Sequence, residues 1–301
     1  FYSLLAIIFL ILKNKNQNLE NKKNVYFYIL SAPIFLWLVY SSKIILFPIL
    51  LIFIIFDHFF KTKKISNFQI IYLAVYLSFI LVCKISFAYE VLVICILLLI
   101  FKFEKKFFLK FISYSIPISL LILFPIFYTK YLFFSDIAPP FLEIYKTHPD
   151  YKLILFKKTL VKDLQDFSSF ALYKFFLLPF IMIITEKSHY FTSLLGIGFL
   201  GIYFVFIKKN FLKKILVKPE FCFVILMLLL LFFSKNLQPR YYVSAYLVFA
   251  LVLFELNSEF KNNFFYIVLF KLVKIQFFVV LFFLILASLF FFSSRFINTV
   301  N

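Results

Sequence analysis

Glycine is almost absent from this sequence. Only 3 of its 301 residues are glycine, and all three lie in the stretch LLGIGFLGI, residues 194–202. Nucleotide-binding folds place several glycines in a loop before a helix, so that the backbone can approach a phosphate group. The sequence has no such loop, which excludes these phosphate-binding sites. The spacing of Gly198 and Gly201 also differs from the four-residue pairing motif of membrane helices, so we expect the glycines to allow close helix packing.

Cysteine and histidine are equally rare, with 3 residues of each type. Cys83, Cys95 and Cys222 all lie inside apolar runs and lack the paired spacing of a zinc site or a disulfide framework. No serine occupies the glycine-flanked turn that presents a hydrolase nucleophile. The sequence therefore predicts no metal site built by the protein, and it leaves open whether a divalent metal acts as a cofactor.

Apolar side chains are what the sequence has in excess. They make up 64% of the chain, 24% of the residues are aromatic, and the mean hydropathy is +1.03, whereas a soluble domain is about half apolar. Phenylalanine alone accounts for 51 residues. An AT-rich coding sequence explains that bias, so no single phenylalanine is given a function. An apolar excess of this size predicts a membrane protein.

The apolar residues form segments that approach the roughly 20 residues a membrane-crossing helix needs. These segments are residues 1–12, 26–41, 43–60, 67–83, 86–101, 108–133, 190–207, 220–234, 240–256 and 275–293. We therefore predict an all-α fold, a bundle of about nine to ten transmembrane helices in one domain that covers residues 1–301. The chain begins with Phe1 inside an apolar run, which predicts that an N-terminal part precedes it.

Positive charge dominates the polar residues. Lysine and arginine number 32, aspartate and glutamate number 13, and the net charge is +19. In a soluble protein this charge would suggest a nucleic-acid partner. Here the lysines gather in short segments between apolar runs, which is the pattern of cytoplasmic membrane loops, so we expect no nucleic acid. The basic segments are residues 13–23, 61–64, 102–110 and 208–218.

The basic segments also predict which side of the membrane each connection faces. Two spans separate each basic segment from the next if all of them are cytoplasmic. For the last pair this holds only if residues 135–189 form an extracytoplasmic loop region. The apolar stretch 171–184 inside it is then an interfacial or re-entrant helix that does not cross. The break SKNLQPR, residues 234–240, falls on the same outer side.

The outer break contains Arg240, one of only two arginines in the sequence; the other is Arg295. A guanidinium group binds phosphate through two parallel hydrogen bonds and stays charged at any working pH. At a membrane surface the nearest phosphate belongs to a lipid. We therefore predict a lipid-phosphate or donor-binding site that includes Arg240, Gln238 and Tyr241. The plainer interpretation of the same residues is an interfacial anchor.

Further polar candidates lie at the outer ends of spans. Lys84 and Glu90 fall between two apolar segments, where ionisable groups tend to face a cavity or one another. Asp136 follows the span 108–133, in which Pro125 is expected to kink or end the helix. We predict that Lys84 contributes to donor binding and that Asp136 and Glu90 are acidic contributors. Simple anchoring or solvation of these side chains is the alternative.

Three segments carry a family resemblance in their order along the chain. They are VCKISFAYE (82–90), LILFPIFYTKYLFFSDIAPPF (121–141) and LQPRYYVSAY (237–246). They resemble, in turn, a span that ends near a lysine, a passage from a span into the outer loop, and the Gln-x-Arg-Tyr entrance to a late span in the GT-C superfamily. This superfamily of polytopic membrane glycosyltransferases includes protein O-mannosyltransferase-like enzymes that use lipid-linked sugars.

The resemblance implies transfer of a sugar from a polyprenyl-phosphate carrier to an acceptor lipid, glycan or protein. The reaction would take place on the outer face of a bacterial cytoplasmic membrane. Arg240 would bind the carrier phosphate and stabilise the charge of the leaving group, with electrostatic help from Lys84. In the family an acidic residue of the first outer loop is the general base, so the resemblance implies that the catalytic carboxylate lies upstream of residue 1.

Two other functions are compatible with the same polar outer side. A polysaccharide polymerase or ligase of the O-antigen type also has a large outer loop, but it relies on several outer arginines, and this chain offers Arg240 and Arg295. A transporter or flippase tends to have inverted repeats and helices broken at mid-membrane. Neither pattern is visible in the sequence.

Overall fold

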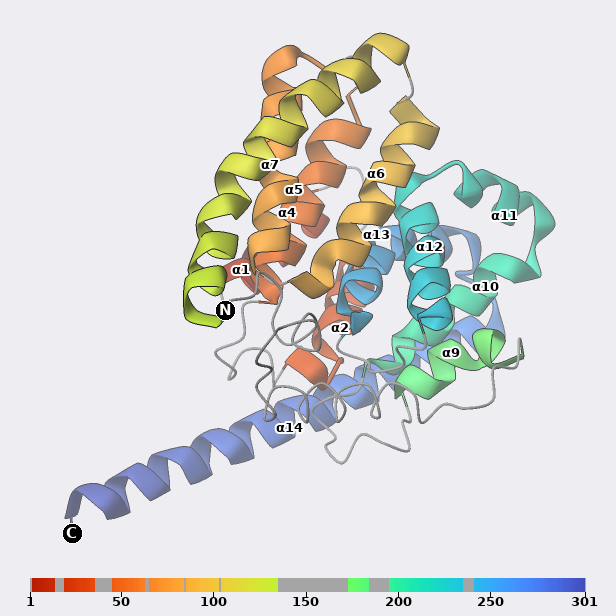
Figure 1. Cartoon of the computed structure of the whole chain (residues 1–301). Coiled ribbons are helices and arrows are strands. Elements are labelled where there is room, and N and C mark those ends of the chain that lie inside the picture. Colours follow the sequence, from red (N-terminus) through yellow and green to blue (C-terminus); the bar gives the residue numbers. More distant parts are fainter. Residues whose placement is uncertain are drawn as a thin grey trace. The chain divides into compact units, whose positions relative to one another are not determined.

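The computed structural model describes residues 2–13, 19–35, 45–62, 65–83, 85–102, 104–134, 173–183, 195–234 and 241–300. Their regular structure is helical and no described residue forms a strand, which confirms the all-α prediction for this part of the chain (Figure 1). The helices form two compact units. Unit 1 combines Phe1–Lys43, Leu177–Ile225 and Gln238–Asn301, and unit 2 combines Ile44–Phe176 and Leu226–Leu237.

Each unit is built from helices that are distant in sequence. Unit 1 contains α1 (Tyr2–Leu12), α2 (Leu19–Leu30), the 3-10 helix η5 (Ile197–Gly201), α10 (Ile202–Ile207), α11 (Lys209–Leu216), α13 (Val243–Glu259) and α14 (Phe264–Val300). Unit 2 contains α4 (Leu46–Ile55), its π-helical continuation η1 (Phe56–Phe60), α5 (Asn67–Cys83), the 3-10 turn η2 (Ile85–Phe87), α6 (Ala88–Lys102) and α7 (Lys105–Phe134). The residues of α9 (Tyr173–Ile183) and α12 (Pro219–Phe233) are divided between the units.

Few of the described helices are long enough to cross a membrane. The stretches Lys106–Phe133 and Phe264–Leu286 qualify by length and composition, and a third span results if α11 and α12, bent by 95° at a short break, count as one. The predicted number of about nine to ten spans is therefore not reached in the described residues. Other apolar helices, such as Asn67–Cys83, have only 10–17 residues. At about 1.5 Å per residue they fall short of a hydrocarbon core about 30 Å thick.

The helix α7 does not end at Pro125, which was one of the two outcomes expected for this proline. It has 30 residues, contains Pro117 and Pro125, and continues to Phe134. Proline inside a helix removes one backbone donor, but membrane helices tolerate it where neighbouring groups satisfy the backbone. Ser119 of α7 shares a hydrogen bond of 2.8 Å with Ser78 of α5, which is a polar contact between these two helices.

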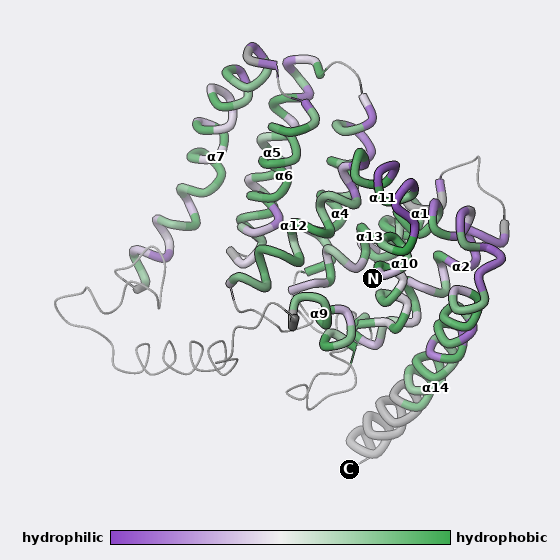
Figure 2. Tube along the Cα trace, turned by 90° about the vertical axis from the view of Figure 1, so that its right-hand side faces the viewer, coloured by the Kyte–Doolittle hydropathy of each residue, from purple (hydrophilic) through white to green (hydrophobic). Residues whose placement is uncertain are grey.

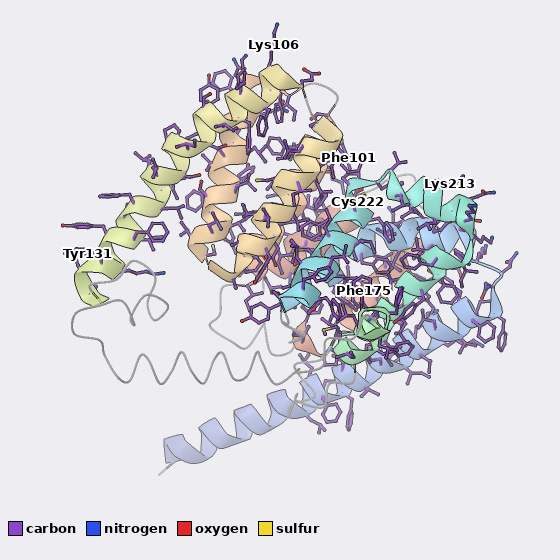
Figure 3. All side chains as sticks on the ribbon, turned by 45° about the vertical axis from the view of Figure 1, so that its right-hand side comes forward. Phe101, Lys106, Tyr131, Phe175, Lys213 and Cys222 are labelled. Carbon is purple, nitrogen blue, oxygen red and sulfur yellow. The ribbon has the colours of Figure 1, made fainter. Side chains whose placement is uncertain are left out.

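The side of α7 that faces away from the other helices of unit 2 is mostly apolar. Exposed large side chains follow one another over several turns: Leu109, Ile112, Ile116, Leu120, Leu121, Phe124, Tyr128, Tyr131, Leu132 and Phe133. The hydropathy colours show an apolar middle between more polar ends (Figure 2). Lys106 and Tyr131 mark the two ends, and both side chains point away from the ribbon (Figure 3). An apolar middle with a basic and an aromatic end is typical of a membrane helix.

Two basic segments of the sequence meet at one end of unit 2. The amine of Lys102 donates to the backbone carbonyl of Thr62, and the amine of Lys110 donates to Oδ1 of Asn67 at 3.0 Å. The rings of Phe60 and Phe101 lie 6.5 Å apart next to these contacts. Partial burial lowers the pKa of the Lys102 amine. The basic segments 61–64 and 102–110, both predicted to be cytoplasmic, therefore share one end of this unit.

Two further elements differ in extent from the predicted ones. The short helix α9 lies within the stretch 171–184, as an interfacial or re-entrant helix requires, while residues 135–172 and 184–189 lie outside the described residues. The helix α14 begins at Phe264, well before the predicted start at residue 275. It includes Lys274, whose amine lies 5.8 Å above the ring of Phe27, and such a cation–π contact lets a lysine lie against an apolar surface.

Candidate functional site

Most of the predicted site residues lie outside the described part of the chain. These are Arg240, Gln238, Lys84 and Asp136. Tyr241 and Glu90 are described, and they belong to different units. What the structure contributes is therefore the scaffold next to each candidate, above all the helix that follows Arg240 in the chain.

Tyr241 leads directly into α13, the most deeply buried helix of unit 1. Tyr241 itself is half-buried, whereas Tyr242 and Val243 are 0% and 1% exposed. In α13, 13 of 17 residues are buried. A helix that is buried on all sides is fixed by its neighbours in both rotation and depth. The segment Gln238–Tyr241 is therefore followed at once by a rigid element.

A pair of tyrosines joins the start of α13 to the end of α2. The hydroxyl of Tyr28 donates to the backbone carbonyl of Tyr246 at 2.8 Å, and the hydroxyl of Tyr246 donates to the backbone carbonyl of Tyr28. Their rings stack with centroids 4.3 Å apart and an angle of 15°. The hydroxyl of Ser31 also donates to the carbonyl of Tyr28, at 2.9 Å. Because all three side chains are fully buried, these bonds replace the hydrogen bonds to water that the hydroxyl groups lose on folding.

The glycine stretch fits against this tyrosine pair. A Cβ atom on Gly196 would lie 2.4 Å from the hydroxyl oxygen of Tyr246, and one on Gly198 would lie 2.4 Å from a ring carbon of Tyr28. Only glycine permits this approach. The 3-10 helix η5 that starts here leaves backbone groups to be satisfied, and Oε1 of Gln276 in α14 accepts a hydrogen bond of 2.8 Å from the backbone N–H of Ile197. The predicted role of the glycines in close packing is confirmed at Gly196 and Gly198.

The opposite end of α13 carries ion pairs to lysines of the segment 208–218. The carboxylate of Glu255 lies 2.6 Å from the amine of Lys218 and 3.1 Å from that of Lys214. Glu259 lies 2.9 Å from Lys208. The two ends of α13 are thus chemically different: one is fixed to a basic segment, and the other follows Arg240 in the chain.

The helices α2 and α13 run in opposite directions. The ring of Phe35, which follows α2, packs 6.2 Å from that of Tyr246, while Tyr28 also packs 6.2 Å from Phe249, one turn further along α13. The start of α2 therefore points toward the ion-paired end of α13. That start belongs to the basic segment 13–23. In unit 1, as in unit 2, two basic segments lie toward the same end.

Glu90 has the position of a helix-terminal carboxylate. It lies in the first turn of α6 and is 5% exposed. Negative charge at this position is stabilised by the helix dipole. Among the described residues no group of three or more histidine, cysteine or acidic side chains could hold a metal ion.

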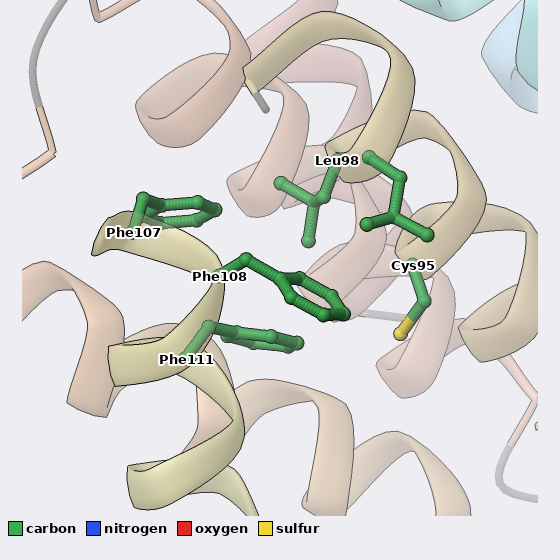
Figure 4. A pocket seen from close by; sticks show the side chains of 6 residues that line it. Cys95, Leu98, Phe107, Phe108 and Phe111 are labelled. Carbon is green, nitrogen blue, oxygen red and sulfur yellow. The ribbon is translucent and has the colours of Figure 1, made fainter. Parts of the chain in front are cut away.

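A small apolar pocket lies between α6 and α7 and has no chemistry of its own. Its volume is about 40 Å³, and its lining side chains are carbon and sulfur only (Figure 4). They are Cys95, Leu98, Leu99, Phe107, Phe108 and Phe111. Cys83, Cys95 and Cys222, which lie inside apolar runs, are half-buried and form no disulfide.

Sequence reasoning missed the residues that hold the start of α13. Tyr28, Ser31, Tyr246 and Gln276 read as ordinary members of apolar segments, and the paired tyrosines are 218 positions apart. The one local signal was the glycine stretch, which predicted close packing but not its partner. Comparisons with protein-family models, with curated proteins and with solved structures found no match.

Proposed function

We propose that the chain is a polytopic membrane glycosyltransferase of the GT-C type. It moves a sugar from a polyprenyl-phosphate carrier to an acceptor on the outer face of a bacterial cytoplasmic membrane. Arg240 binds the carrier phosphate, with Gln238, Tyr241 and Lys84 as further donor-binding residues. Asp136 and Glu90 contribute negative charge near the acceptor. The proposed transmembrane bundle includes more helices than the few that are long enough to cross a membrane by themselves.

The observation that carries the proposal is the polarity of α13. Its Glu255 end is ion-paired to the basic segment 208–218, and its other end follows Arg240 directly in the chain. A helix of 17 residues is about 25 Å long at about 1.5 Å per residue. This is less than a hydrocarbon core about 30 Å thick. If the basic segments are cytoplasmic, the charge difference between the two ends of α13, rather than its length, supports the proposed outer position of Arg240.

A firmly packed helix directly after Arg240 in the chain supports catalysis over anchoring. An interfacial anchor needs only a charged tip on a flexible stem. A group that stabilises a transition state must be held in place before the reaction starts. The tyrosine pair of Tyr28 and Tyr246 fixes the first turns of α13 within six residues of Arg240. This rigidity supports a catalytic role for the arginine rather than an anchoring role.

A transporter or flippase is the second candidate, and one observation favours it. Residues Ile197–Gly201 form a 3-10 helix, and Gln276 satisfies part of its backbone. Irregular backbone inside a membrane protein is typical of transport pathways. Close packing of the glycines against Tyr28 and Tyr246 also explains this irregular backbone. We therefore propose the transferase as the first candidate function.

Sugar transfer by the purified full chain tests the proposal. The chain is reconstituted in vesicles with a polyprenyl-phosphate sugar labelled in the sugar, and the label is followed into lipid, glycan and peptide acceptors. We expect transfer with the lipid-phosphate donor and none with a nucleotide sugar. Movement of the labelled lipid across the bilayer without transfer would favour the flippase. Absence of both activities over a panel of donor sugars would contradict the proposal.

A further inference from the structure

The turn from α10 into α12 presents lysines and exposed apolar side chains on one surface. Lys209, Lys213 and Lys214 are exposed, and the side chain of Lys213 points away from the unit (Figure 3). Exposed apolar residues flank them on both sides: Phe206 at 53%, Ile207 at 62%, Leu216 at 48% and Val217 at 71%. We call these seven residues the α11 surface.

The helix α11 is docked so that most of this surface faces away from the rest of unit 1; of its lysines, Lys214 alone forms an ion pair with another described residue, Glu255. Phe211 and Ile215 point inward, at 3% and 0% exposure, and the ring of Phe211 packs edge-on against Phe260 at 5.6 Å. Because the apolar side of the helix is already covered, its lysine side faces outward. The exposed apolar residues are those at its two ends.

The charge of this region is only partly compensated within the unit. Glu255 and Glu259 pair with Lys208, Lys214 and Lys218. Glu220, in the first turn of α12, is the remaining nearby carboxylate. Five lysines against three carboxylates leave the region positive. Lys209 and Lys213 make no ion pair with another described residue.

We propose that the α11 surface binds the anionic headgroups of membrane phospholipids. Lysine side chains attract anionic lipid, and apolar side chains at the same depth enter the boundary between headgroups and acyl chains. A nucleic acid would engage the lysines but would leave Phe206, Ile207, Leu216 and Val217 in water. The combination of both kinds of side chain therefore favours a lipid surface. This inference rests on the membrane part of the proposed function and is independent of sugar transfer.

Lipid titrations of the full chain test the inference. The purified chain in neutral detergent is titrated with phosphatidylglycerol and with phosphatidylcholine, and bound lipid is measured by native mass spectrometry. We expect tighter binding of phosphatidylglycerol, with an apparent affinity that falls roughly fivefold for each lysine removed in K209Q and K213Q. Added salt should weaken the binding in the unmodified chain.

Two matched variants separate charge from structure. K209R/K213R keeps the charge and should retain the preference for phosphatidylglycerol. K130Q removes one charge near the C-terminal end of α7, which belongs to unit 2 and not to the α11 surface. This variant should leave the preference for phosphatidylglycerol unchanged. Equal binding of the two lipids, or a K209Q/K213Q chain that binds phosphatidylglycerol as tightly as the unmodified one, would overturn the inference. Loss of sugar transfer with the lipid preference intact would count against the proposed function only.

Discussion

Replacing Arg240 with alanine is expected to lower the rate of sugar transfer by about a hundredfold or more. Removing one group that stabilises developing charge in a transition state costs about two to three orders of magnitude in rate. The loss should appear mainly in kcat, because the phosphate carries its greatest charge as the sugar leaves. Arg240→Lys keeps the charge but loses the planar pair of donors, so we expect intermediate activity. Transfer from a polyprenyl-phosphate sugar by purified variants measures both effects.

Arg295 provides the matched control for this experiment, since it is the other arginine of the chain. A transferase with one phosphate-binding arginine should retain its activity in Arg295→Lys. A polymerase or ligase that uses several outer arginines should lose activity when either Arg240 or Arg295 is replaced. If Arg240→Ala transferred sugar at the unmodified rate with an unchanged KM, the phosphate-binding role of this residue would be wrong.

Replacing Gly198 with alanine is expected to destabilise unit 1 by about 1–3 kcal/mol. The added methyl group would lie 2.4 Å from a ring carbon of Tyr28 and 3.1 Å from Val273. The Tyr28 ring cannot move freely, because it is stacked on Tyr246 and its hydroxyl donates a hydrogen bond to the backbone carbonyl of Tyr246. Overpacking of a filled interior has a cost of this size. The thermal unfolding midpoint of the detergent-solubilised chain measures it, and Gly198→Val should lower the midpoint further.

Gly201 is the internal control for this prediction. A Cβ atom there would meet its nearest neighbour at 3.5 Å, in ordinary van der Waals contact. Gly201→Ala should therefore change stability by less than about 1 kcal/mol. An equal loss in both variants would mean that alanine is harmful anywhere in this stretch and that the tyrosine pair is not the cause. An unchanged midpoint in Gly198→Ala would contradict the packing described for Tyr28.

The positions of most helices followed from composition, but their lengths did not. Apolar runs predicted the approximate positions of α5, α6 and α7, because a helix needs apolar side chains whether it is buried in lipid or in protein. The ends of helices depend on local contacts that composition does not record. The helix α14 begins at Phe264, where Oδ1 of Asn263 accepts a hydrogen bond from the backbone N–H of Tyr266. Pro125 does not end α7, although proline in isolation predicts a break.

The basic segments indicated which connections between helices lie at the same end of a unit. They did so because several lysines in one segment act together, whereas a single residue carries little information. Contacts of Lys102 and Lys110 with residues 62 and 67 bring two of these segments together in unit 2. The tyrosine pair could not be predicted in this way. Tyr28 and Tyr246 become partners only when α2 and α13 pack in opposite directions, and that arrangement depends on contacts across 218 positions of sequence.

The side of the membrane that each end of α13 faces is the most direct test of the account. Single cysteines replace Lys61, Lys213 or Lys235 in a chain whose Cys83, Cys95 and Cys222 are alanine. A membrane-impermeant maleimide is then added to sealed vesicles of known orientation. We predict that residues 61 and 213 react only from the cytoplasmic side and residue 235 only from the outer side. Reaction of residues 213 and 235 from the same side would contradict the proposed placement of Arg240.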